Sequence, residues 1–375
     1  MNSQSTFYRY FIYSAVISSC FVIPSGLNAD GFRAQAGETT WVTDNVFLDR
    51  SLEWDLVLRP MAELAVDFAD FYTAGYSGEL NVYTQHEELL SHWHQLYLFL
   101  NPAWGPEGEH EFSLELSVQT LRNQSEYSAN NLVRPVLFAR LSMEPESWFR
   151  WTVGAKAAYG WCYDDQPSNT MDFWGNAEVS FTLPSWSTLS PRAAFGYRYY
   201  PDQDLAAAAD DQDQQLEIGA HFSQALWENA GLQLDYAYAY AVGESGLLLR
   251  KLTQEQFSYL DQGFLYSGNQ AMVGLKQLLG EDWVCEIAAR FKEYQFAGWR
   301  ALDASGVPTG EERHDLRLSP VVSLSYFWDI GQTDQGDASV QLQFSLEYSF
   351  TKQWSNTDLY DVSAHSVGAS IIGSF

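Results

Sequence analysis

The chain has 375 residues, 46% of them hydrophobic and 16% aromatic, and 48 acidic against 20 basic residues give it a formal net charge of −28 at pH 7. This acidic balance disfavours nucleic acid as a partner, because contacts with a phosphate backbone need a basic surface. The aromatic content excludes a disordered acidic chain, since disordered chains are poor in aromatic residues. The composition therefore predicts a folded protein that packs much aromatic surface against a core or against lipid.

Residues 1–29 have the pattern of a secretory signal peptide. Arg9 precedes an apolar stretch, Phe11–Ile23, and Leu27-Asn28-Ala29 supplies a cleavage site. The apolar stretch is too short to cross a bilayer as a helix. Alternatively, Ile17-Ser18-Ser19-Cys20 resembles a lipoprotein box. In either case the chain is exported, and we predict two segments, the signal peptide 1–29 and a single domain 30–375.

Beyond residue 30 the strongest pattern is alternation of apolar and polar residues. Ser339–Phe350 alternates throughout, and Leu232–Val242 and Leu216–Ser223 follow the same period. A helix would repeat every 3.6 residues, so this pattern predicts β-strands. The segments run for about ten to fourteen residues, against about five or six in an ordinary soluble sheet. A strand that crosses a membrane needs roughly nine to eleven residues, so the lengths favour a membrane barrel.

In chain order we predict two weaker strands and then a series of clear ones. They cover 37–46, 51–59, 70–84, 92–100, 110–122, 132–143, 147–160, 171–183, 189–200, 213–225, 231–242, 265–279, 283–297, 313–328, 338–350 and 363–375. Short gaps (144–146, 227–230, 280–282) alternate with long ones (201–212, 243–264, 298–312), and if the last strand runs down to the periplasm every long gap lies outside. The prediction is an all-β, antiparallel up-and-down barrel of about sixteen strands, or about fourteen if the first pair is only a plug or tail.

The carboxy-terminal segment carries a resemblance. Val367, Ala369 and Ile371 alternate with small polar residues, and the chain ends on Phe375. A last strand that closes on an aromatic residue resembles the insertion signal of bacterial outer-membrane barrels. Thr43–Phe47 and Gly75–Leu80 are loosely similar to segments of porin-like barrels associated with envelope or exopolysaccharide systems. The resemblance implies a location in the cell outer membrane, in contact with its lipid.

If the apolar register faces lipid, the other register faces the lumen and carries charges of both signs. An outward Arg or Lys would cost about 2–4 kcal/mol at the bilayer midplane, so the place of these cations on the polar register supports the assignment. We predict that they act in solute selectivity. The predicted lumen residues are Arg150, Lys156, Arg192, Arg198, Lys276, Arg290, Lys292, Arg317, Glu111, Glu115, Glu178, Glu217, Asp235, Glu286, Asp315 and Glu347.

The predicted function is passive diffusion of small hydrophilic solutes or ions, because side chains alone cannot fill so wide a barrel. One alternative is an export barrel of a polysaccharide or envelope system, with a partner at its periplasmic mouth. Another is a structural or adhesive barrel. The sequence also does not decide against a lumen that is plugged by its own ion pairs. The sequence leaves a homo-oligomer possible. We predict no enzyme and no cofactor: His221 and Ser223 share a face, but no glycine-framed serine and no phosphate-binding loop occurs.

Two local features have competing explanations. The segment 243–264 holds Leu247-Leu248-Leu249-Arg250-Lys251 and then Phe257 and Tyr259, which is unusually apolar for a solvated loop. It either packs on neighbouring outer loops or folds inward and narrows the pore. His92 and His94 share a strand face, but no cysteine or carboxylate pair has matching spacing, so we expect them at the lipid interface and predict no metal site.

Cysteine and tryptophan positions give geometric predictions. Cys162 should lie at the outer rim and Cys285 near a periplasmic turn, too far apart for a disulfide. Tryptophans at strand ends should form two girdles at the membrane interfaces, and the predicted members are Trp148, Trp161, Trp283, Trp328 and Trp354.

Overall fold

The computed structural model describes residues 31–46, 53–69, 71–106, 108–124, 127–128, 131–162, 169–201, 212–242, 266–303, 305–332 and 338–374. They form one antiparallel sheet of seventeen strands. The strands are β1 (Phe32–Thr43), β2 (Asp55–Ala69), β3 (Tyr72–Tyr83), β4 (Ser91–Leu100), β5 (Ala103–Trp104), β6 (His110–Asn123), β7 (Leu132–Glu146), β8 (Phe149–Cys162), β9 (Thr170–Leu183), β10 (Ser187–Tyr199), β11 (Gln212–Trp227), β12 (Ala230–Val242), β13 (Gly268–Leu279), β14 (Trp283–Leu302), β15 (Pro308–Gln332), β16 (Ala338–Ser355) and β17 (Val362–Ser374).

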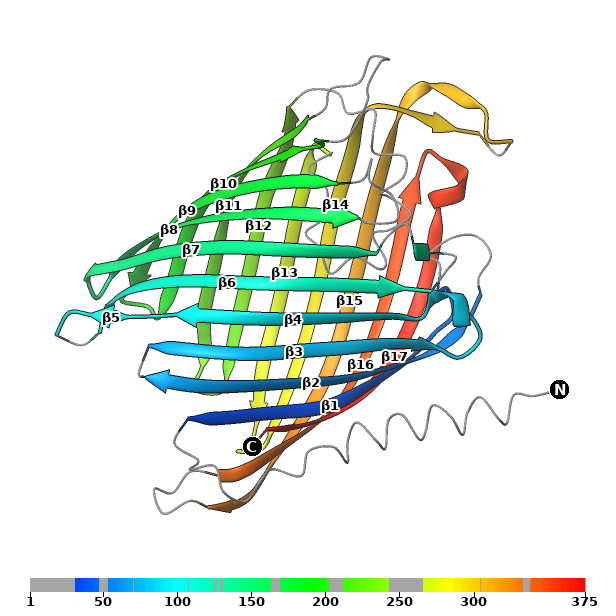
Figure 1. Ribbon diagram of the computed structural model, residues 1–375. Coiled ribbons are helices and arrows are strands. Elements are labelled where there is room, and N and C mark those ends of the chain that lie inside the picture. The colour runs from blue at the N-terminus through cyan, green and yellow to red at the C-terminus, as the bar shows by residue number, and fades with distance from the viewer. Residues whose placement is uncertain are drawn as a thin grey trace.

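The sheet closes on itself as a barrel (Figure 1). The first strand pairs with β2 on one side and with β17 on the other, from Gln35 opposite Ser374 to Thr43 opposite Ser366. The two-residue β5 pairs with β6 beside the turn, while β4 pairs directly with β6, so the wall consists of the other sixteen strands. The predicted barrel of about sixteen strands is confirmed. The alternative of about fourteen is wrong, because the first pair belongs to the wall.

Several predicted boundaries need correction. The strand expected at 37–46 lies at Phe32–Thr43, and the strand expected at 338–350 runs on to Ser355. The strand expected at 51–59 runs on to Ala69, through Pro60, which points outward to the lipid side. The gap 298–312, expected as a long outer loop, is largely strand: β14 extends to Leu302 and β15 begins at Pro308, with a tight turn between them. In that turn Asp303 accepts hydrogen bonds from the backbone N–H groups of Ser305 and Val307, which fix it locally.

The lengths of the connections define the two ends of the barrel. Short turns lie at one end, at 70–71, 147–148, 184–186, 228–229 and 280–282, and the longer connections gather at the other. One connection departs from the predicted alternation, because 101–109 lies at the short-turn end and contains β5. Outer-membrane barrels have their short turns in the periplasm, which places the long connections outside the cell.

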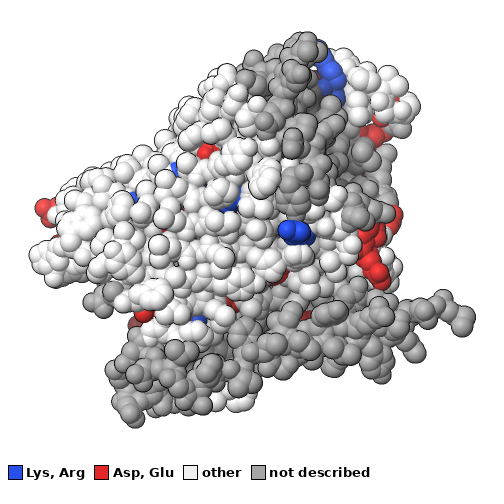
Figure 2. All heavy atoms as spheres, viewed as in Figure 1, with Lys and Arg blue, Asp and Glu red and all other residues white. Residues whose placement is uncertain are grey.

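The outer surface of the wall is apolar. Half-exposed aliphatic side chains recur on alternate positions around the barrel, among them Leu96 at 64% exposure and Leu346 at 61%. A band of this extent would cause aggregation in water, so it contacts the hydrocarbon of the membrane instead. The wall that faces the viewer in Figure 2 is accordingly almost free of charged atoms.

The tryptophans and cysteines lie where the strand order requires. Trp148, Trp161, Trp283, Trp328 and Trp354 are each about half exposed at strand ends. Cys162 ends β8 on the outer side and Cys285 lies near the periplasmic start of β14, and no disulfide joins these two described cysteines. No helix in the described part of the chain is long and apolar enough to cross a membrane.

Buried apolar residues form two small clusters near the outer ends of the strands. One contains Val46, Val57, Tyr83 and Leu89, with Trp41 and Tyr127 packed against it. The other contains Ala239, Tyr266, Tyr294 and Phe296. Elsewhere inside the barrel the side chains are mostly polar or charged, so the interior is more like a hydrated passage than a hydrophobic core.

Candidate functional site: the lumen

Strand register places the predicted selectivity residues on the inner face of the wall. Lys292 lies opposite Arg317 on the next strand, Lys276 opposite Glu286, and Arg192 opposite Glu178. The remaining members occupy the same alternating positions of their strands, namely Arg150, Lys156, Arg198, Arg290, Glu111, Glu115, Glu217, Asp235, Asp315 and Glu347. Their part in selectivity stays a prediction, whereas their common orientation follows from the register.

A cavity of about 610 Å³ occupies the barrel interior. Its lining includes Gln95 on β4 and Lys292 on β14, which stand on opposite walls of the barrel. Four cations face three carboxylates around it: Arg134, Lys156, Arg198 and Lys292 against Glu115, Asp172 and Glu217. We call this space the central cavity. Its mixed and slightly basic lining suits hydrated solutes of either charge.

A second cavity, of about 890 Å³, lies at the periplasmic ends of the early strands. Three carboxylates, Glu63, Asp67 and Glu115, face a single cation, Arg33, in its lining. Each carboxylate is held in place: Arg33 donates to Asp67 at 2.9 Å, and the Tyr97 hydroxyl donates to Glu63 at 2.9 Å. We call this space the vestibule. It is acidic where the central cavity is slightly basic.

The two cavities meet at one pair of side chains. Gln95 and Glu115 are the residues that line both, and the Gln95 amide donates to the Glu115 carboxylate at 2.9 Å. The sequence pointed to Glu115 through its register but not to Gln95, because a neutral glutamine carries no electrostatic signal. The pair therefore lies on the wall where the vestibule and the central cavity adjoin.

A buried ionic cluster borders the central cavity on its outer side. Asp172 accepts hydrogen bonds from Arg198 at 2.5 and 3.1 Å and from Arg134 at 2.9 Å. All three residues are less than 9% exposed. Of the three, Arg198 was predicted from the sequence to face the lumen, and Asp172 and Arg134 were not. Alternation alone could have put both on the inner face, but their contact spans β7 to β10 and depends on the tilt of the strands.

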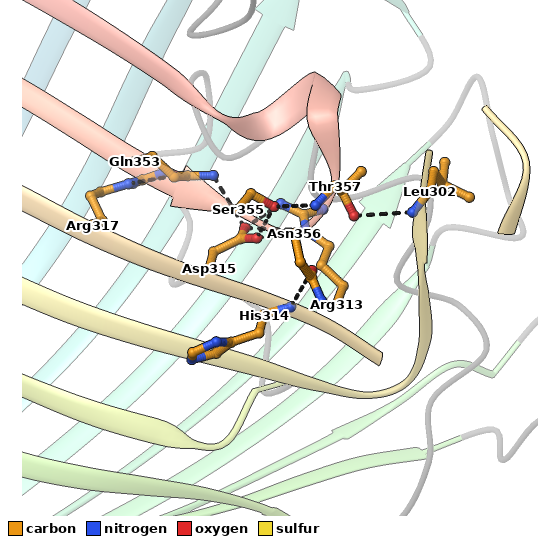
Figure 3. Close-up of polar contacts among 9 residues, drawn as sticks. All are labelled: Leu302, Arg313, His314, Asp315, Arg317, Gln353, Ser355, Asn356 and Thr357. Carbon is orange, nitrogen blue, oxygen red and sulfur yellow. Dashed lines mark hydrogen bonds and ion pairs between the residues drawn. The ribbon is translucent and has the colours of Figure 1, made fainter. Parts of the chain in front are cut away.

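Another cluster stiffens the opposite part of the outer rim (Figure 3). Asp315, which is 1% exposed, forms an ion pair with Arg313 and accepts hydrogen bonds from Ser355 at 2.5 Å and Gln353 at 3.1 Å. Gln353 in turn accepts from Arg317 at 2.9 Å, so the predicted lumen residues Asp315 and Arg317 belong to one network. These groups hold β15 and β16 together. Because their charges are paired within the network, fewer of them are available to bind a solute.

The histidines named from the sequence lie on both faces of the wall. His221 contacts Asp235 at 2.9 Å, and Arg192 lies 3.7 Å from both Asp235 and Glu217, which makes an ion-pair network on the inner face. His92 and His94 share the outward register of Leu96 and Leu98 and so face the lipid, while their level at the lipid interface stays a prediction. Among the described residues no three His, Cys, Asp or Glu side chains are placed to hold a metal ion. The apolar segment predicted at 243–264 lies outside the described residues.

Comparisons with known proteins concern the fold. No protein-family model matches the chain, and a search of curated proteins finds no match in sequence. Among solved structures, a bacterial polysaccharide outer-membrane secretin matches 93% of this chain and 99% of its own at 9% identity, with a TM-score of 0.50. OprD from Pseudomonas aeruginosa matches 92% of this chain and 93% of its own at 8% identity and a TM-score of 0.48. CdiB from Acinetobacter baumannii matches at 10% identity and a TM-score of 0.48, and this chain spans 60% of its length.

Proposed function

Since the chain is a bacterial outer-membrane β-barrel with a polar lumen, we propose that it is a passive channel for small hydrophilic solutes or ions. The observation that carries the proposal is the pair of adjoining cavities, whose linings bear charged and amide groups. Water-filled interiors are typical of barrels of this width, because their side chains do not meet across the middle. Charges of both signs in the linings favour solutes that keep their hydration over apolar ligands.

The lining predicts a graded electrostatic path. A solute that enters from the periplasm meets an excess of carboxylates in the vestibule and then an excess of cations in the central cavity. Rings and patches of one sign bias a pore toward ions of the opposite sign. Because the two regions oppose each other, we expect weak selectivity by charge and stronger selectivity by size at the Gln95–Glu115 pair.

Solute flux into proteoliposomes tests the proposal. Vesicles that contain the refolded barrel should swell in isotonic arabinose or glucose, and the rate should fall steeply for tri- and tetrasaccharides. Vesicles that contain an outer-membrane barrel of eight strands, whose interior is filled by side chains, provide the matched control. If swelling with arabinose is no faster than in this control, the barrel is not a passive channel.

Polysaccharide export is the second candidate. The fold likeness to the secretin shows a shared barrel only, but the vestibule adds an observation, because Tyr97 and Phe99 line it beside Glu63. Aromatic faces next to carboxylates are suited to sugar rings, since one side is apolar and the other accepts hydrogen bonds. An exporter that depends on periplasmic partners would admit no small sugars by itself, so the swelling assay distinguishes the two candidates.

A further inference from the structure

A chain of hydrogen bonds crosses the lipid-facing surface from the middle of β3 toward the outer end of β4. The Tyr76 hydroxyl lies 2.8 Å from Nδ1 of His94, and Nε2 of His94 lies 2.9 Å from Nδ1 of His92. The two histidines occupy the same register as Leu96 and Leu98, which are exposed on the outside of the barrel. These polar groups therefore face the membrane and not the lumen.

The tautomers assigned to the two histidines decide what the chain offers to a ligand. A neutral imidazole has one N–H donor and one acceptor nitrogen. With the Tyr76 hydroxyl as donor at Nδ1 of His94, Nε2 of His94 carries its proton and donates to Nδ1 of His92. His92 is then left with an N–H at Nε2, at the outer end of the chain. Linked hydrogen bonds polarise one another, which strengthens this last donor.

Arg122 stands beside that donor. It lies directly opposite His92 on β6 and is exposed. Within the described strands of the wall, two other cations lie on the outward register: Lys352, which contacts Asp361 at 2.5 Å, and Arg300, which lies opposite Glu312 on the extended outer end of β14. An outward arginine costs about 2–4 kcal/mol at the midplane but about 0–1 near the interface. Arg122, the last residue but one of β6 at its outer end, thus belongs at the level of the lipid headgroups.

An apolar groove continues from this polar cluster toward the bilayer centre. It has a volume of about 770 Å³ and crosses the outer face of β3 to β9. Leu96, two residues from His94 on the same face of β4, lines it, as does Val118, four residues from Arg122 on β6. A cationic head site above an apolar groove matches a lipid with an anionic headgroup.

We propose that Tyr76, His94, His92 and Arg122 form a binding site for the phosphate of an outer-leaflet lipid, with an acyl chain in the groove below. Arg122 supplies charge-assisted hydrogen bonds to the phosphate oxygens, and His92 supplies a further donor. The groove decides between lipid and free phosphate, because it adds apolar contact that inorganic phosphate cannot use. The site would hold a lipid to a protein whose net charge of −28 otherwise repels anionic headgroups.

Native mass spectrometry of the detergent-solubilised full barrel tests this site. The probes are phosphatidic acid, a diacylglycerol with the same chains, and inorganic phosphate. We expect phosphatidic acid to bind and the other two to bind far more weakly. Arg122→Gln should weaken phosphatidic acid binding about tenfold, which is what the loss of a hydrogen bond to a charged group produces.

Two further variants test whether the loss of binding is specific to this site. Lys352→Gln, the loss of an outward cation on the distant strand β16, should leave binding unchanged, and His92→Gln should weaken it. Equal binding by Arg122→Gln and the unaltered protein would overturn the proposal. Diacylglycerol binding as tight as that of phosphatidic acid would also overturn it, because the apolar groove alone would then explain the binding. Tight binding of inorganic phosphate would show an anion site that does not use the lipid chain.

Discussion

Asp172→Asn should destabilise the barrel by about 3–5 kcal/mol, the range found when one partner of a buried ion pair is removed. The carboxylate is the shared acceptor of Arg134 and Arg198, and all three side chains are buried. The amide keeps the size of the side chain but removes the negative charge and one acceptor oxygen. The two guanidinium groups would then repel each other with little solvent to screen them.

Denaturant unfolding in lipid vesicles, followed by tryptophan fluorescence, measures this change. Glu347→Gln is the matched control, because it makes the same chemical change at an exposed inner-face carboxylate on β16. A surface substitution of this kind is worth about 0.5 kcal/mol or less. If both variants unfold at the same denaturant concentration as the unaltered protein, the ionic cluster does not hold β7, β9 and β10 together.

Gln95→Trp should reduce ion conductance severalfold without loss of the fold. The side chain stands where the vestibule and the central cavity adjoin, and an indole ring there would project into the lumen and narrow it. Constriction by a bulky apolar group also removes water from the narrowest part of a pore. The strand itself should accept the change, since aromatic residues are well suited to β-sheets.

The control for this variant is Gln343→Trp. Gln343 points inward from β16, opposite Ile372 of β17, and lines neither cavity. Conductance of this control should stay near that of the unaltered barrel. Equal conductance of all three proteins would mean that ions take a path other than the one between the two cavities.

Alternation predicted the wall of the barrel well and was less clear where the inward face mixes apolar and charged residues. In Ser339–Phe350 outward and inward residues differ in polarity at every step, and the strand was predicted over most of its length. In β2 the inward face mixes apolar Val57, Met61 and Ala65 with the charged Arg59, Glu63 and Asp67, so the period is blurred. The strand also continues through Pro60, because an outward proline on a barrel strand is tolerated.

The site was predictable in its parts but not in its connections. Register alone put Glu115, Lys292 and Asp315 on the inner face. It could not show that Gln95 and Glu115 join two cavities, nor that Arg134 contacts Asp172 two strands away. Such contacts depend on strand tilt and barrel shear, which a single strand does not encode. Only half of the outer-face cluster was predicted from the sequence. His92 and His94 were expected at the lipid interface, but Tyr76 and Arg122 lie on neighbouring strands, and one strand alone does not show that they meet the histidines.

Single-channel recording in planar bilayers tests the open lumen most directly. The refolded chain should give stable conductance steps of uniform size in potassium chloride, and a salt gradient should give a small reversal potential, as expected for a path with opposed charges. A barrel that inserts in folded form but stays electrically silent at all voltages would contradict the account, because the two cavities would then be closed off from each other or from the solution.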